Sequence, residues 1–140
     1  MRQARLWLGT PFRHQAALRG VGCDCLGLIR GVAAELDICP ALDLGVIGSY
    51  ARAPNPAHMG RHLSAHLRRV RRPRQGDIAW LEWREGLPMH LAYLAGEGAE
   101  RTLIHAWETA GGVIEHGFLA EWPGRVRAWW RLPALSEGGN

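Results

Sequence analysis

The 140-residue sequence contains no lysine, and all 17 of its basic residues are arginine. A total absence of this kind is typical of a biased genome composition more than of a function. Against 13 acidic residues the arginines give a formal net charge of +4. This charge predicts affinity for something acidic, but it does not separate nucleic acid, an anionic cell-wall polymer and a partner protein.

A disulfide framework and long apolar runs are also missing. The cysteines are Cys23, Cys25 and Cys39, and an odd number with two of them two positions apart predicts reduced thiols. No apolar segment has the length of a membrane span, and no apolar run follows Arg2 and Arg5 at the amino end. We therefore expect neither a signal peptide nor a membrane span.

What the sequence does contain is an ordinary globular composition, with 47% hydrophobic and 21% charged residues. The length predicts a single domain over residues 1–135 and a disordered tail over 136–140. Helical patterns come first: residues 1–8 as the end of a short helix, then 25–36 and 56–67. Alternating patterns follow at 78–83, 90–95, 102–107, 113–117 and 125–132. The order predicts an α+β fold, with helices on one face of a mainly antiparallel sheet of about five strands.

The segments between these elements are predicted to be irregular. Residues 12–22 and 38–56 read as loops, and 68–74 as a basic connector. Arg68 to Arg74 is most simply a solvated connector; the functional alternative is a grip on acidic peptides or on an acidic partner. Trp129 and Trp130 are adjacent on a predicted strand, so they point to opposite faces, and one of them is a candidate docking residue.

A glycine-rich turn leads into the helix predicted at Cys25. Asp24 has the side chain of an N-cap, which would start the helix at the cysteine. At that position the helix dipole and the unpaired backbone N–H groups favour a thiolate. The stretch therefore predicts Cys25 as a nucleophile, and the alternative is a buried cysteine that acts as a small hydrophobe.

A thiol nucleophile needs an imidazole base and a third polar group to orient that base. His90 begins one predicted strand and His105 lies inside the next. If the two strands pair, both histidines can point to the same side of the sheet. We expect that side to be the one that packs on the Cys25 helix.

These residues and their order resemble the NlpC family of cell-wall cysteine peptidases, and more closely its short branch encoded with phage tails and gene transfer agents. The resemblance covers nearly the whole chain. It runs through Trp7–His14, Gly22–Leu28, Gly76–Asp77, His90 and Ile104–Ala106.

The resemblance implies a papain-like NlpC fold with Cys25 as nucleophile, His90 as general base and His105 as the residue that orients the base. It also implies cleavage of amide bonds in peptidoglycan stem peptides, without a metal or organic cofactor. The expected partners are these peptides and the tail or baseplate proteins of a phage-like particle, not nucleic acid. A chain made in the cytoplasm without a signal peptide would then act in the periplasm or cell wall as part of such a particle.

The oxyanion site is less clearly marked. Many family members carry a tyrosine near the position of Phe12, and phenylalanine cannot donate a hydrogen bond. His14 is a substitute donor, and the backbone N–H of Cys25 should contribute as well. Asp24 also lies next to Cys25. We interpret it first as the N-cap of the helix, and the alternative is a catalytic acid. The runner-up function is a structural or plugging tail-tip subunit with the same fold and little peptidase activity, which the phenylalanine favours.

The sequence also offers two conceivable metal sites. One would use Cys23, Cys25, Cys39 and His14, but the Cys-x-Cys spacing is not that of a structural zinc pair. The other would use histidines four residues apart on the helix predicted over 56–67. No carboxylate lies between these histidines, so a solvated polar face is the simpler interpretation.

Overall fold

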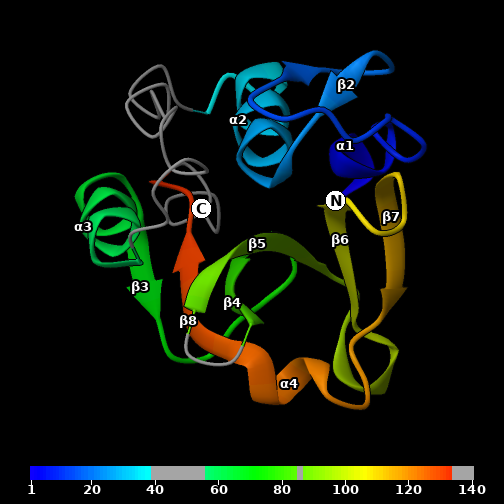
Figure 1. Cartoon of the computed structure of the whole chain (residues 1–140). Coiled ribbons are helices and arrows are strands. Elements are labelled where there is room, and N and C mark those ends of the chain that lie inside the picture. Colours follow the sequence, from blue (N-terminus) through cyan, green and yellow to red (C-terminus); the bar gives the residue numbers. More distant parts are fainter. Residues whose placement is uncertain (39–55, 85–86, 134–140) are drawn as a thin grey trace.

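The computed structural model describes residues 1–38, 56–84 and 87–133 (Figure 1). The helices are α1 (Arg2–Arg5), α2 (Cys25–Glu35), α3 (Pro56–His66), α4 (Trp122–Arg125) and the short 3-10 helix η2 (Gly98–Glu100). The strands are β1 (Ala17–Leu18), β2 (Gly22–Cys23), β3 (Arg68–Val70), β4 (Ile78–Arg84), β5 (Leu87–Ala95), β6 (Thr102–Trp107), β7 (Gly112–Gly117) and β8 (Val126–Arg131). Residues 39–55 of the predicted loop and the predicted tail lie outside the described residues.

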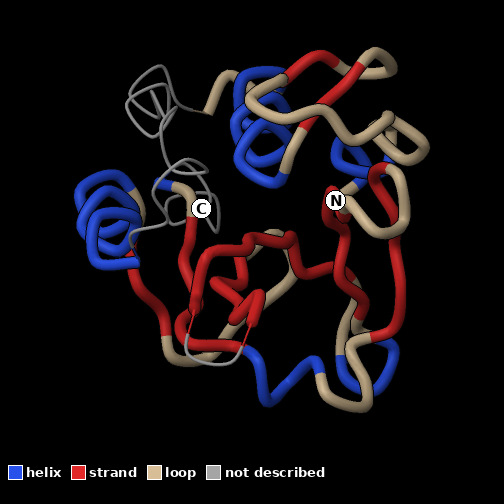
Figure 2. The backbone as a smooth tube through the Cα atoms, viewed as in Figure 1, coloured by secondary structure: helices blue, strands red, loops and turns tan. Residues whose placement is uncertain are grey.

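The main sheet has six strands in the order β3-β8-β4-β5-β6-β7, and each neighbouring pair is antiparallel. All five predicted strands are present as β4 to β8. The sheet is larger than predicted because β3 forms within the expected connector, where Arg68 to Val70 pair with Arg131 to Trp129. Charged side chains suit an exposed edge strand, since they discourage pairing with other molecules. Figure 2 shows the strands bending through the lower part of the view, with α2 above them.

Helix α2 begins at Cys25, as predicted. Leu28, Ile29 and Val32 are almost wholly buried on it. The loop that precedes the helix contains the β1–β2 hairpin, which the sequence did not indicate. That loop lies so close to the first turn of the helix that a Cβ on Gly27 would fall 1.8 Å from the carbonyl oxygen of Ala16. Only glycine fits there without moving the loop.

Both faces of the sheet are buried. One core combines residues of α1, α2 and α3 with one face of the sheet, including Leu91, Tyr93 and Ile104. The Tyr93 hydroxyl donates a hydrogen bond to the Ile29 carbonyl of α2, at 2.9 Å. The other face packs with Trp122 of α4 in a second core, which includes Leu81, Ala92, Leu94 and Leu103. Burial on both faces explains why the middle of β5 reads as a continuous apolar run.

A buried ion pair fixes the crossover from β3 to β4, which passes β8. The Arg131 guanidinium donates through Nε and Nη2 to the two carboxylate oxygens of Asp77, at 2.8 Å each. The two side chains are 9% and 1% exposed. Such a bidentate pair holds the start of β4 against the end of β8.

Within the described ranges, no helix has the length and apolar character needed to cross a membrane.

Candidate active site

Asp24 positions the start of α2. Its side chain accepts hydrogen bonds from the backbone N–H of Gly27, at 2.8 Å, and from that of Gln15, at 2.7 Å. The residue is 2% exposed. One oxygen caps the helix and the other ties down the loop that precedes it. The prediction of an N-cap is therefore confirmed.

Cys25 meets the sheet where β5 and β6 separate. The ladder between these strands pairs Tyr93 with Ile104 and extends no further toward His90. Leu94 exchanges its backbone hydrogen bonds with Gly76 and Asp77 on the β4 side. Because amides alternate along a strand, the N–H of Leu91 points to the β6 side, where the ladder is absent. The Cys25 thiol receives a hydrogen bond from that N–H, so the sulfur lies beside the residue that follows His90.

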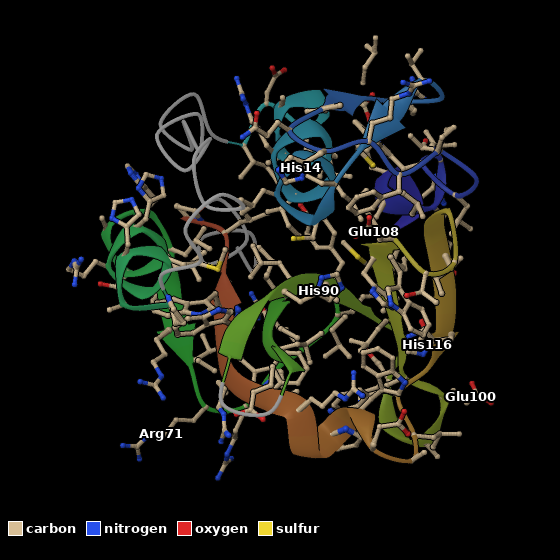
Figure 3. The ribbon with its side chains drawn as sticks, viewed as in Figure 1. His14, Arg71, His90, Glu100, Glu108 and His116 are labelled. Atoms are coloured by element: carbon tan, nitrogen blue, oxygen red, sulfur yellow. The ribbon has the colours of Figure 1, made fainter. Side chains whose placement is uncertain are left out.

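Three histidines from three neighbouring strands form a hydrogen-bonded row, which we call the histidine row: His90 of β5, His105 of β6 and His116 of β7. The distance from His90 Nε2 to His105 Nδ1 is 2.7 Å, and from His105 Nε2 to His116 Nε2 it is 2.8 Å. His116 Nδ1 lies 2.9 Å from the carbonyl oxygen of Gly117. Figure 3 shows His90 in the middle of the molecule and His116 toward its right-hand edge.

The Gly117 carbonyl determines which nitrogens carry protons. A carbonyl oxygen only accepts, so His116 Nδ1 must donate, and in neutral His116 Nε2 then accepts. His105 Nε2 therefore donates to His116, and its Nδ1 accepts from His90 Nε2. With Nε2 protonated, neutral His90 has its lone pair on Nδ1. The row thus makes Nδ1 the basic nitrogen of neutral His90, the atom that a general base would use.

The prediction that His90 and His105 share a sheet face is confirmed, but the predicted face is wrong. His90 pairs with Leu81 of the second core, and His105 packs on Trp122 with ring centroids 5.3 Å apart. The neighbours Leu91 and Ile104 point the other way, into the core that contains α2. Cys25 belongs to that α2 core, so the nucleophile candidate and the histidine rings approach from opposite faces where β5 and β6 separate.

Burial governs the protonation of these groups. Desolvation, with a smaller contribution from the charge of Asp24, raises the pKa of Cys25 to about 12, although the amides of Leu91 and Leu26 and its own N–H oppose this. Desolvation lowers the pKa of His90 to about 3, and Coulombic repulsion from Arg125, and from His116 when that ring carries a proton on both nitrogens, adds to the effect. In the resting state Cys25 is therefore a thiol and His90 is a neutral imidazole. This pKa direction is opposite to the one that the helix N-terminus alone predicts, because Cys25 is only 5% exposed.

The centre of the histidine row is the most strongly desolvated. Burial lowers the pKa of His105 to about 2, and Coulombic repulsion from His90 and His116, when those rings are protonated, adds to the effect. The ring stacks on Trp107, with centroids 5.7 Å apart and planes 22° apart. Trp122 also lies 4.6 Å from the ring of His116. These indoles exclude water from the row and restrict the orientation of its rings.

The other predicted site residues lie outside the histidine row. The backbone of Phe12 forms a bridge to Cys23, and its half-buried ring packs on the α2 core. His14 is exposed on the loop between α1 and β1, and Figure 3 shows it over α2, apart from His90. Cys23 is fully buried, and desolvation raises its pKa to about 12, which suits a core residue.

Of the two conceivable metal sites, the one that includes Cys39 is not tested. Cys39 lies outside the described residues. The helix predicted over 56–67 is present as α3, where the rings of His62 and His66 are 4.7 Å apart. In the part of the chain that the structure describes, no group of three or more His, Cys, Asp or Glu residues could hold a metal ion.

Sequence reasoning missed His116. It lies on β7, which pairs with β6 through a turn at Gly111 and Gly112, so that His116 is opposite Leu103 and diagonal to His105. The predicted strand at 113–117 already contained this histidine. Applying the register of a tight hairpin to that strand would have placed it on the face of His105.

No family model matches the sequence, and no curated protein matches it. The fold does have a solved neighbour, the crystal structure of a protein similar to a lipoprotein of the NLP/P60 family from Staphylococcus aureus subsp. aureus Mu50. The two superpose with a TM-score of 0.64 at 17% sequence identity, over 94% of this chain. This chain spans 39% of the neighbour's length. The comparison establishes that the chain has an NLP/P60-like fold of helices and antiparallel sheet.

Proposed function

We propose that this protein is a cysteine peptidase that cleaves amide bonds of peptidoglycan stem peptides. The observation that supports it best is the histidine row, which ends at His90, the residue directly before the Leu91 N–H that binds the Cys25 thiol. The NLP/P60-like fold adds to this support.

In the proposed reaction, the Cys25 proton passes to His90 Nδ1 while the sulfur attacks the carbonyl carbon of the scissile amide. Because the resting pair is neutral, this transfer accompanies the attack. The backbone N–H of Cys25 donates to the developing oxyanion. The C–N bond then breaks, the departing amine takes the proton from His90, and a thioester remains. Water then attacks the thioester and gives a proton to His90, the C–S bond breaks, and His90 returns the proton to the Cys25 sulfur as the acid is released.

The choice of peptidoglycan comes from the sequence resemblance to NlpC peptidases and from the NLP/P60 neighbour. The same resemblance favours delivery to the periplasm or cell wall on a phage-like tail, with tail or baseplate proteins as partners. Purification of intact particles, followed by detection of this chain by mass spectrometry, tests the delivery separately from the chemistry.

The test of the enzymatic proposal is digestion of purified peptidoglycan, with soluble peptides analysed by mass spectrometry. We expect the wild type and a Cys23→Ala variant to release peptides and a Cys25→Ala variant to release none. Cys23 is the matched control because it is also a buried thiol in the same core. Identical products from wild type and Cys25→Ala, or none from either, contradict the proposal.

A second candidate is a structural tail-tip subunit with the same fold and little activity. The 5% exposure of Cys25 and the absence of a hydroxyl at Phe12 favour it. Thiol alkylation separates the two, because a Cys25 served by a base reacts at a rate that changes in a His90→Ala variant. In a structural subunit, the Cys25 rate is the same in both proteins and no faster than that of a model thiol.

A further inference from the structure

The outer edge of β8 is only half covered by β3. The three residues of β3 pair with Trp129, Trp130 and Arg131. On its other side β8 pairs with β4 as far as Val126. In the described ranges, the segment Val126–Ala128 therefore has a strand neighbour on one side only. An edge of this kind presents backbone N–H and C=O groups that can pair with an added strand.

A basic groove runs along this free edge. It is a cavity of about 650 Å³, lined by residues of β3, β8 and α4 that include Arg69, Arg71, Arg127, Pro123, Val126 and Trp129. The three arginines are exposed. Arg127 is held by an ion pair with Glu82, so the net positive charge of the groove comes from Arg69 and Arg71.

The groove is separate from the candidate active site. It lies at β3 and β8, whereas the histidine row belongs to β5, β6 and β7, and β4 stands between the two groups in the sheet. In Figure 3, Arg71 is at the lower left and His116 at the right. None of the residues that line the groove belongs to the histidine row.

We propose that this groove binds an extended acidic peptide, which adds to the free edge of β8 as a strand. The peptide backbone would pair with Val126–Ala128, and its carboxylates would bind Arg69 and Arg71, whose guanidinium groups match carboxylate geometry. Trp129 and Pro123 give an apolar surface for the alternate side chains. Strand addition of this kind takes affinity from the backbone and specificity from side-chain contacts. A phosphate polymer fits less well, since it cannot pair with a strand.

The probe is an end-blocked, dye-labelled peptide of alternating glutamate and valine, about eight residues long. Its binding to the full chain is measured by fluorescence anisotropy at low salt. Two further probes have the same length: one replaces each valine by proline, which keeps the charge but removes backbone donors, and the other replaces glutamate by lysine. We expect saturable binding of the first probe only. Equal binding of the proline peptide, or displacement of the first probe by inorganic polyphosphate at a lower concentration than by unlabelled peptide, overturns the proposal.

Charge reversal locates the site. We expect Arg71→Glu and Arg69→Glu each to weaken binding of the glutamate–valine peptide by about tenfold or more, because an attractive contact becomes a repulsive one. Arg61→Glu on α3 is the matched control, since it is an exposed arginine outside the groove with the same change of charge. An equal loss in all three variants shows attraction by net charge alone and refutes the site. Binding is also expected to be unchanged in Cys25→Ala, so the result does not depend on the proposed peptidase activity.

Discussion

Acidification is expected to destabilise this protein before its carboxylates protonate, because two neutral histidines are buried in the sheet. His90 is 5% exposed and His105 is fully buried. Burial lowers the pKa of His90 from 6.5 to about 3 and that of His105 from 6.5 to about 2. Well above pH 6.5 both are neutral whether the chain is folded or unfolded, so they add no pH dependence there. Below it, the unfolded chain binds protons that the folded chain excludes, and stability falls.

The magnitude follows from the same pKa values. At pH 5.0 an unfolded histidine of ordinary pKa gains about 2 kcal/mol from protonation, whereas the folded His90 and His105 gain almost nothing. The two together should lower the free energy of unfolding by about 4 kcal/mol between pH 7.5 and pH 5.0. This is a large part of the 5 to 15 kcal/mol or so that stabilises a typical domain. The lowered pKa values of Glu35 and Glu115 cost stability only at more acidic pH, through and below 4.5.

Urea unfolding, followed by tryptophan fluorescence at pH 7.5, 6.5 and 5.0, measures this loss. A His105→Gln variant should lose only about half as much stability over this pH range, since one of the two buried bases has gone. His14→Gln should keep the full loss, because His14 is exposed. A free energy of unfolding that is the same at pH 7.5 and 5.0, or an undiminished loss in His105→Gln, would refute the reasoning.

Two further predictions concern side chains that act at a distance from Cys25. His116→Ala removes the acceptor that orders the protons of the histidine row. We expect this variant to cleave peptidoglycan about 10 to 100 times more slowly with KM unchanged, and we expect His116→Gln to stay close to wild type. An equal loss of kcat in both variants contradicts a role of His116 in proton order. Asp77→Asn leaves the buried Arg131 guanidinium without its countercharge, and we expect a loss of about 3 to 5 kcal/mol in urea unfolding at pH 7.5. Replacing Asp77 and Arg131 together by leucine should restore most of that loss, and a loss below about 1 kcal/mol in Asp77→Asn would show that the pair is not a major support.

The strands from β4 to β8 could be predicted from the sequence because alternating segments are separated by turns such as Gly111-Gly112. Strand β3 could not. Its residues Arg68 to Val70 offer no apolar face, and they become a strand only because the end of β8 lies beside them. Whether this segment forms a strand therefore depends on tertiary contacts, which local propensity does not describe.

The candidate site divides in the same way. Sequence identified the residue types and the shared face of His90 and His105, since both follow from the period of a strand. It could not say which face α2 covers. Alternation sorts the residues of a strand into two faces, but it does not tell which of the two faces packs against a given helix. Nor could it give the pKa direction of Cys25, which depends on how deeply the start of α2 is buried.

The proton order of the histidine row is anchored on the carbonyl of Gly117, a main-chain atom. Every amino acid has that oxygen, so no change of side chain at position 117 can delete it or turn it into a donor. Mutation can break the row at His105 or His116, but as long as β7 keeps its path and His116 stays neutral, the direction of the row is set by the backbone. The basicity of one nitrogen on β5 thus depends on where a strand two places away comes to its end.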